Sequence, residues 1–551
     1  MKKRAKAKMK LFLILLITII GRSAYPQVWQ WSNLVRNAKE GGGSSRAYLW
    51  IPENCKKVRG VIVAQNNMEE LSILENKSFR QEMTDLGLAE IWVAPSFSHV
   101  FNFKEGAGET FNGIMNDLAD SSGYEELKFA PVVAIGHSAA ASWPYYFAVW
   151  NPQRTLACVS VSGQWPYFRN PQFAPDIWSK DQHIDFVPSL ETMGEYEAAD
   201  TWSAEGLKER QAHPYMPLSM LAAPAEGHFA ATQKKIDYIA RYIKKAVLYR
   251  LKQDVTTTSP ATLNPIDPTK SGWLVDKWRK DQLPTAPAAP VEKFTGNAAE
   301  AFWFFDEEMA RATEKYEAAY RHMKPQLLGY IQEGKMVNQK NTHLQVDLKF
   351  LPKADGITFS LTGKFMDTVS GGSSRLKDWA ELPVGSVIGH SSNNTSISID
   401  PVIGPVKKIA HDVFELALQK GYEGRSQLVI TFAATHPGDK IYKPAVQQSQ
   451  MIIPRNTTGF DQHIDFAFIP NQPIVKYGLS LNATSDAGMP VYFFVKEGPA
   501  TVKGHTLKFS KIPLRANYPV KVTIVAWQWG RGTEPKVKTA EPVERSFFIT
   551  R

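Results

Sequence analysis

The sequence predicts an α/β domain with a mostly parallel sheet, followed by a helical linker and one or two β-sandwich-like domains. Three observations support this order. Between about residues 46 and 249, short apolar runs alternate with amphipathic stretches, which is the pattern of βαβ units. Residues 256–289 are rich in Thr, Pro and Ala. Beyond Pro325, short strand-like segments separated by turn residues dominate.

The composition is that of a folded protein. The chain has 551 residues, of which 43% are hydrophobic and 21% charged, a balance that excludes disorder, collagen and coiled coil. The length predicts roughly three domains. Two cysteines, Cys55 and Cys158, are too few for a disulfide framework or a four-cysteine zinc site. We expect two buried thiols, and a single bridge between them is the alternative.

The N-terminus predicts export. A basic segment precedes the ten-residue apolar run Leu11–Ile20, and the small-residue triplet Gly21-Arg22-Ser23 follows it. This is the pattern of a cleavable secretory signal over residues 1–23, because a membrane span needs about 20 apolar residues. Cleavage would reduce the net charge from +10 to +3, so the basicity does not indicate a nucleic-acid partner. We expect a secreted or periplasmic protein without membrane contact after cleavage; an uncleaved N-terminal anchor is the alternative.

The elements of the α/β domain, placed at 28–255, follow from apolar runs and helical periodicity. The predicted strands are Gly60–Ala64, Ile91–Ala94, Pro131–Ile135, Leu156–Val161, Val187–Met193 and Leu218–Ala222. The predicted helices are Ser78–Leu86, Gly113–Ala119, Ala139–Val149 and a closing amphipathic helix over Thr232–Leu251.

The rest of the chain divides into three parts. Residues 256–330 are expected to be a Pro-rich packed linker plus a helix over 297–322, where Phe302, Phe305, Met309, Ala312 and Tyr316 recur at helical spacing. Trp273, Leu274 and Trp278 should pin this linker to a neighbouring domain. A β-rich domain is predicted over 331–463. Residues 464–551 resemble the immunoglobulin-like modules appended to secreted bacterial enzymes, which implies a spacer or docking part.

One motif in the α/β domain carries chemistry. The apolar strand Ala134-Ile135 runs into Gly136-His137-Ser138-Ala139-Ala140 and then into a helical pattern. This is the context of a nucleophile elbow, in which small residues two positions before and after the serine allow a cramped turn. Gly136 and Ala140 meet that requirement. Ser138 is therefore the candidate nucleophile.

A serine nucleophile needs a base and an acid that orients the base. Gly194-Glu195-Tyr196-Glu197 follows the strand Val187–Met193, and Glu197 falls at the acid position. His228 follows the strand Leu218–Ala222 in a short loop before the closing helix. Glu195 and, more weakly, Asp200 are the alternative acids.

With this order of serine, acid and histidine, residues 46–249 resemble the α/β-hydrolases, a superfamily of esterases, lipases and some peptidases. The resemblance implies Ser138 as nucleophile, His228 as general base and Glu197 as its orienting acid. It also implies two oxyanion donors: the backbone N–H of Ala139 and a second at Asn66 or Asn67. Any lid is expected within Gln164–Asp185. Trp143 and Trp165 are the candidate substrate-binding aromatics, because flat aromatic faces suit sugar rings.

The leading function is an exported serine esterase acting on substituents of polysaccharides. Its partner is an ester substrate, and it needs no metal or organic cofactor. Two alternatives stay open: a peptidase or amidase that uses the same residues, and a catalytically inactive surface protein that binds glycans.

Overall fold

The computed structural model describes residues 28–167, 177–179, 181–343, 345–392, 395–474 and 478–551. The predicted signal segment 1–23 lies outside these residues, as does part of the predicted lid. Within the described ranges, no helix has both the length and the apolar character needed to cross a bilayer.

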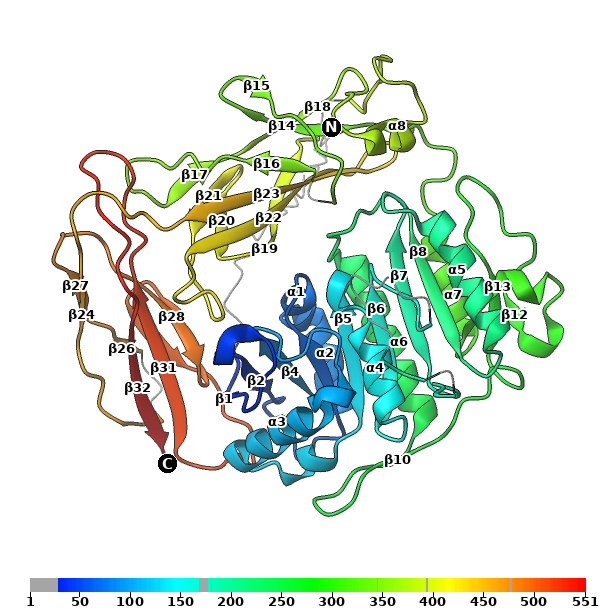
Figure 1. The fold of residues 1–551 in the computed structure, drawn as a ribbon, viewed down its shortest axis with the longest axis horizontal. Helices are drawn as coiled ribbons and strands as arrows, with labels where there is room; N and C mark the ends of the chain where they lie inside the picture. The colour runs from blue at the N-terminus through cyan, green and yellow to red at the C-terminus, as the bar shows by residue number, and fades with distance from the viewer. Residues whose placement is uncertain (1–27, 168–176, 180, 344, 393–394, 475–477) are drawn as a thin grey trace, which may run out of the picture.

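The N-terminal region is built on an eight-stranded sheet with helices packed against it (Figure 1). The strand order is β1-β2-β4-β3-β5-β6-β7-β8; β2 pairs antiparallel with both β1 and β4, and the pairs from β4 to β8 are all parallel. This is the strand order of the α/β-hydrolase fold, so the predicted fold class is confirmed. The strands are β1 (Trp31–Leu34), β2 (Arg46–Trp50), β3 (Gly60–Gln65), β4 (Leu88–Ala94), β5 (Val132–His137), β6 (Thr155–Val161), β7 (Ser189–Gly194) and β8 (Leu218–Ala223).

Four of the helices that connect these strands lie close to the positions that the sequence predicts, whereas Glu70–Leu74 and Ala199–Ala212 are helices that it does not predict. The helices are α1 (Glu70–Leu74), α2 (Lys77–Leu86), α3 (Ala107–Ser122), α4 (Trp143–Trp150), α5 (Ala199–Ala212) and α6 (Gln233–Arg250). The helix expected at 139–149 instead starts with the 3-10 turn Ser138–Ala140, because the chain must first turn sharply after β5. Cys55 and Cys158 are both buried and free, which excludes the alternative bridge between them.

The linker packs into the core of the sheet region. Leu274 and Trp278 are buried and Trp273 is partly buried in the same apolar cluster as the parallel strands. The linker elements are β9 (Leu251–Gln253), β10 (Thr262–Leu263), β11 (Trp273–Asp276), β12 (Ala289–Pro290), β13 (Ala301–Phe304) and α7 (Glu307–Glu317).

The predicted helix over 297–322 is wrong in its first part. Ala301–Phe304 is a strand that pairs with β11, and its consecutive aromatic residues favour a strand over a helix. The helix begins only after Asp306, whose carboxylate accepts a hydrogen bond from the N–H of Met309 at 3.0 Å.

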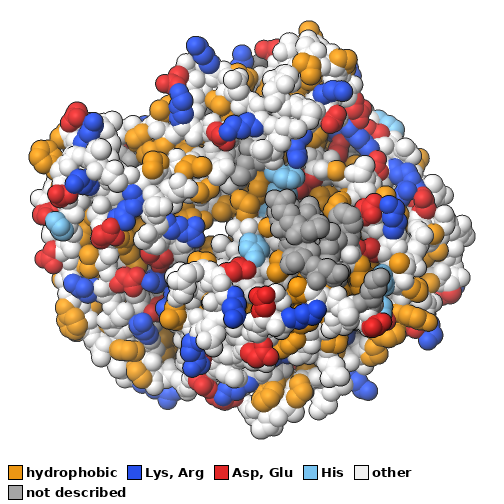
Figure 2. Space-filling view, in the orientation of Figure 1, with side chains coloured by type: hydrophobic (Ala, Val, Ile, Leu, Met, Phe, Trp, Pro, Cys, Tyr) orange, Lys and Arg blue, Asp and Glu red, His pale blue; other side chains and the backbone are white. Residues whose placement is uncertain are grey.

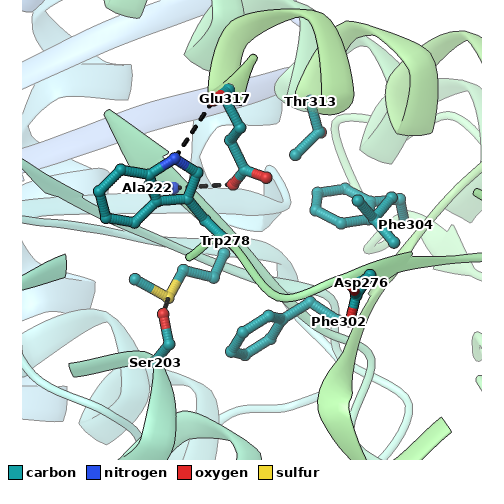
Figure 3. A pocket seen from close by; sticks show the side chains of 10 residues that line it. Ser203, Ala222, Asp276, Trp278, Phe302, Phe304, Thr313 and Glu317 are labelled. Atoms are coloured by element: carbon teal, nitrogen blue, oxygen red, sulfur yellow. Dashed lines mark hydrogen bonds between the residues drawn. The ribbon is translucent and has the colours of Figure 1, made fainter. Parts of the chain in front are cut away.

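Figure 3 shows where this linker meets the parallel sheet. The N–H of Ala222 on β8 donates to the carboxylate of Glu317 at 3.0 Å, and the indole of Trp278 donates to the Glu317 carbonyl at 3.2 Å. The small hollow drawn there is lined by core side chains and has no room for a ligand. We therefore assign it to packing.

The middle of the chain forms three small sheets over a shared apolar cluster. The first contains β14 (Leu328–Gln332), β15 (Lys335–Met336) and β18 (Thr362–Phe365); the second β16 (Val346–Leu348), β19 (Ser398–Ile403), β22 (Gln427–His436) and β23 (Ala445–Pro454); the third β17 (Thr358–Ser360), β20 (Val406–Ala410) and β21 (Val413–Leu416). The short helix α8 (Ser374–Ala380) also belongs to this β-rich region.

The C-terminal strands are sandwich-like. A four-stranded sheet and a three-stranded sheet enclose their own apolar cluster. The strands are β24 (Ile464–Phe466), β25 (Gln472–Pro473), β26 (Leu479–Ser480), β27 (Ala483–Ser485), β28 (Tyr492–Glu497), β29 (Ala500–Lys503), β30 (Thr506–Phe509), β31 (Val520–Trp527) and β32 (Val543–Thr550). Their specific immunoglobulin-like character stays a prediction.

The C-terminal region returns to the start of the sheet region, near β1 and α3 (Figure 1). Arg515 pairs with Glu126 at 2.9 Å, and Arg46 on β2 pairs with Glu497 at 3.2 Å. The β-rich region lies above the parallel sheet in Figure 1, and it contacts the segments that follow two of its strands: Ser72 in α1 after β3 donates to the Val402 carbonyl at 2.8 Å, and Glu195 after β7 pairs with Lys443.

Candidate active site

Ser138 occupies a sharp turn directly after β5. Its φ is +55°, in the left-handed region that non-glycine residues rarely adopt. The turn brings the Ala140 carbonyl so close to Gly136 that a Cβ there would lie 2.0 Å from the oxygen. Glycine is therefore required at position 136. The strained turn places the Ser138 side chain at the carboxyl edge of the sheet, where it is half-buried.

His228 lies in the loop between β8 and α6, and its ring joins the other two candidate side chains. Its Nε2 is 2.9 Å from the Ser138 hydroxyl oxygen. Its Nδ1 forms a hydrogen bond with a Glu197 carboxylate oxygen. Since a carboxylate can only accept, the neutral ring carries its proton on Nδ1 and presents Nε2 as an acceptor to the serine hydroxyl.

Glu197 follows β7 and is held by hydrogen bonds to its second carboxylate oxygen. The Ser162 hydroxyl donates to that oxygen at 2.8 Å and the Gly194 N–H at 3.1 Å. Burial alone would raise the pKa of Glu197, but the charge of His228 and the hydrogen bonds outweigh burial and lower the pKa to about 2. Glu197 is therefore an anion at neutral pH.

The two alternative acids lie elsewhere. Glu195 accepts a hydrogen bond from the Ala225 N–H at 2.8 Å and pairs with Lys443 of the β-rich region. Asp200 is exposed in the first turn of α5. Of the three candidates, only Glu197 contacts His228.

Glu70 holds the loop after β3 against the elbow. One carboxylate oxygen accepts from the N–H groups of Asn67 and Met68, at 3.1 and 2.7 Å. The other accepts from the N–H of His137 at 2.8 Å. Burial raises the pKa of Glu70 to about 7 although these hydrogen bonds oppose the rise. No local sequence pattern predicts this role, because it depends on the loop after β3 meeting the end of β5.

These contacts bear on the expected oxyanion donors. The Asn66 N–H donates to the Val93 carbonyl at 2.8 Å, so the donor expected at Asn66 is already used between β3 and β4. The Asn67 N–H is used by Glu70. By contrast, the Ala139 N–H donates to no acceptor within the described part of the chain. It remains available at the elbow.

The aromatic residues expected to bind substrate are core residues instead. Trp143 is 0% exposed, and its indole donates to the Ile135 carbonyl at 2.9 Å. Trp165 is 1% exposed and stacks on Phe302 with ring centroids 5.8 Å apart. The rings of Phe101 and Phe147 pack against Trp143, and Trp202 also stacks on Trp165. The interpretation of Trp143 and Trp165 as substrate-binding residues is therefore wrong.

Sequence reasoning missed three neighbours of His228 and Glu197. Ser162 directly follows β6, so its place at the end of a parallel strand was a usable signal. Gln448 and His343 come from the β-rich region, and no local pattern predicts their approach. The ring of His343 stacks on that of His228 with centroids 4.1 Å apart.

Glu197, His228 and His343 also offer donor atoms within 4.8 Å of one another. A metal ion would need in-plane nitrogen lone pairs that converge. The two imidazole planes are only 23° apart in a stack, so the nitrogen lone pairs lie in two separate, nearly parallel planes, and Nδ1 of His228 already bonds Glu197. The arrangement fits a hydrogen-bonded chain better than a metal centre.

No family model matches this chain, and no curated protein matches it. Solved structures with a similar fold include a dienelactone hydrolase from Anabaena variabilis, which is 15% identical, with 42% of this chain and 100% of that chain covered and a TM-score of 0.29. An S-formylglutathione hydrolase from Agrobacterium tumefaciens is 12% identical, with coverages of 40% and 93% and a TM-score of 0.29. The fluorophosphonate-binding serine hydrolase F of Staphylococcus aureus is 12% identical, with coverages of 39% and 96% and a TM-score of 0.29. Likeness at this level does not identify an activity.

Proposed function

We propose that the chain is a serine hydrolase that cleaves carboxylic esters through Ser138, His228 and Glu197. The observation that carries this proposal is the continuous hydrogen-bonded chain from the Ser138 hydroxyl through both ring nitrogens of His228 to the Glu197 carboxylate. Three residues separated by up to 90 positions meet in the order that activates a hydroxyl.

Each group has a defined task in the proposed reaction. The Ser138 oxygen attacks the ester carbonyl while His228 Nε2 takes its proton, and Glu197 stabilises the imidazolium. The Ala139 N–H donates to the oxyanion of the tetrahedral intermediate. The imidazolium then gives its proton to the leaving alcohol, which leaves an acyl group on Ser138.

Water completes the cycle. His228 removes a proton from a water molecule, the resulting hydroxide equivalent attacks the acyl group, and the carboxylic acid leaves as Ser138 regains its proton. The residues that perform these steps are all in the chain, so the proposed reaction has no step that calls for a cofactor.

For the substrate, the proposal extends to esters on polysaccharides. Esterified polysaccharide outside the cell would fit the predicted export and the attached β regions, whereas the buried Trp143 and Trp165 give no support to sugar binding. The same three side chains could also cleave amides. The third alternative, an inactive glycan-binding protein, leaves the hydrogen bonds that join Ser138, His228 and Glu197 without a function.

The test compares ester and amide substrates directly. We expect the protein to hydrolyse p-nitrophenyl acetate much faster than aminoacyl p-nitroanilides, and to release acetate, methanol or ferulate from at least one member of a polysaccharide panel. Faster amide cleavage would favour the peptidase. Failure to hydrolyse any ester or amide, together with measurable binding to a glycan, would contradict the hydrolase.

A further inference from the structure

The β-rich region reaches into the candidate active site through Gln448 on β23. Its side chain is 2% exposed. With its amide oxygen turned toward the loop after β8, that oxygen accepts from the N–H groups of His228 and Phe229, at 3.2 and 2.7 Å, and its amino group donates to the His343 carbonyl at 3.2 Å. One amide thus joins the loop of His228 to the segment that carries His343.

His343 covers one face of the His228 ring and remains exposed on its other side. Partial burial, followed by the nearby charges of His228 and Arg375, lowers the pKa of His343 to about 4. His343 is therefore neutral at the pH where most esterases are assayed. A neutral imidazole has one donor nitrogen and one acceptor nitrogen.

Arg375 decides which nitrogen of His343 is the donor. It lies in α8, and its Nη1 is 3.3 Å from His343 Nδ1. Because a guanidinium only donates, His343 Nδ1 is the acceptor and the ring proton is on Nε2. The pair therefore offers an N–H of His343 and the remaining N–H groups of Arg375, all of them donors, beside His228.

Arg375 differs from the other cations near this edge. Lys443 pairs with Glu195, and Lys280 pairs with Glu195 and Glu381. In the ranges that the structure describes, no carboxylate lies within ion-pair distance of Arg375, which is half-buried. Figure 2 shows basic and acidic side chains intermingled over this face of the molecule, so no broad field of one sign would attract an anion. Any preference for charge must be local.

We infer that the β-rich region forms one wall of the active site and that Arg375, with His343, selects esters that carry a carboxylate near the scissile bond. A guanidinium binds a carboxylate through two parallel N–H bonds. The ligand would supply the negative charge that Arg375 lacks within the protein. This inference rests on the proposed esterase function and names its substrate class.

The test uses two pairs of substrates that differ in charge. The p-nitrophenyl half-ester of adipic acid and p-nitrophenyl hexanoate place the difference in the acyl group; 4-acetoxybenzoate and phenyl acetate place it in the leaving group. Each kcat/KM is compared between variants for one substrate, so intrinsic reactivity cancels. Arg375→Gln should lower kcat/KM by about 10- to 100-fold for at least one anionic ester and less than about twofold for its neutral partner.

Two controls separate charge from folding. Lys377→Gln removes an exposed cation from the same helix and should change no ratio. Arg375→Lys should retain part of the preference for anionic esters, because lysine keeps the positive charge but cannot donate two parallel N–H bonds to a carboxylate. If Arg375→Gln does not fold, the salt dependence of the unmodified protein tests the same charge preference. Between 0.05 and 0.5 M NaCl, kcat/KM should fall for the anionic ester but not for its neutral partner, because salt screens the attraction to Arg375.

The outcomes are distinct. Equal losses on charged and neutral esters, or no loss on either, would overturn the role of Arg375 while leaving the esterase intact. If the unmodified protein hydrolyses none of the four esters, the proposed function itself fails.

Discussion

The parallel sheet and the β-rich region contribute to the same site in different ways. Ser138, Glu197 and His228 each follow a buried parallel strand, so the backbone of the sheet fixes where they stand. His343 and Arg375 lie in a loop and a short helix and keep solvent exposure. In the proposed esterase, the parallel sheet would hold the three side chains that break the ester bond, whereas the β-rich region would supply recognition through Arg375 and support the His228 loop through Gln448.

The largest loss of activity should come from a substitution at the end of the parallel sheet. Ser138→Ala removes the nucleophile and should lower kcat for ester hydrolysis by about 10⁴- to 10⁶-fold, with little change in the melting temperature. Ser142→Ala is the matched control, because Ser142 is buried nearby and its hydroxyl has no hydrogen-bond partner among the residues that the structure describes. Steady-state kinetics on p-nitrophenyl acetate measures both. Equal rates for the two variants would remove Ser138 from the mechanism.

The next effect distinguishes two carboxylates that the sequence leaves as alternatives. Glu197→Gln should lower kcat by about 10³- to 10⁴-fold, because an amide can donate to His228 Nδ1 and so stabilise the wrong tautomer. Glu195→Gln should lower kcat less than about tenfold, through the loss of its ion pair with Lys443. A larger loss for Glu195→Gln would assign the acid to Glu195. The low pKa of Glu197 also predicts that activity does not depend on its titration above about pH 3.

A smaller effect measures how far the β-rich region supports the sheet. Gln448→Met removes the acceptor of two backbone N–H groups in the His228 loop and should lower kcat about tenfold for charged and neutral esters alike. Gln450→Met, at a half-buried position on the same strand, should have little effect. If both variants retain full activity, the β-rich region does not position His228.

The smallest effect concerns stability in the linker. Burial raises the pKa of Glu317 to about 8. A carboxyl group whose folded pKa lies above its unfolded value of 4.5 contributes stability below pH 4.5, and this contribution is lost as the pH rises through 8. Glu317→Gln should therefore raise Tm at pH 9 by about 2–8 °C and leave Tm at pH 5 nearly unchanged.

Thermal unfolding at the two pH values checks this. Glu307→Gln, exposed on the same helix, should be neutral at both. A Tm for Glu317→Gln that is lower than that of the unmodified protein at pH 9 would contradict the account of Glu317. Ester hydrolysis should be unchanged in both variants.

The sequence predicted what depends on short-range order. Apolar strands, the small residues around Ser138, and the order of Ser138, Glu197 and His228 are local patterns, so the parallel sheet and the three candidate side chains could be identified. The prediction for Trp143 and Trp165 is wrong because the sequence does not show whether an aromatic side chain is buried in a core or exposed in a binding site. The strand Ala301–Phe304 is mispredicted as helix because Phe302 and Phe305 are three residues apart, which is a helical spacing, although Phe305 lies just outside the strand.

What the sequence could not predict depends on contacts between distant segments. Glu70 joins the loop after β3 to the elbow, and Gln448 approaches His228 from 220 residues further along the chain. Such contacts leave no periodic signal. The same limit applies to the choice between Glu195 and Glu197, which differ only in the direction that each side chain takes after β7.

The most direct test of the central claim is covalent labelling of the full chain with a fluorophosphonate, followed by mass spectrometry of its peptides. We predict one stoichiometric adduct on Ser138, which disappears in Ser138→Ala and forms far more slowly in Glu197→Gln. An unlabelled protein, or an adduct on another residue that persists in Ser138→Ala, would contradict the claim that His228 and Glu197 activate Ser138.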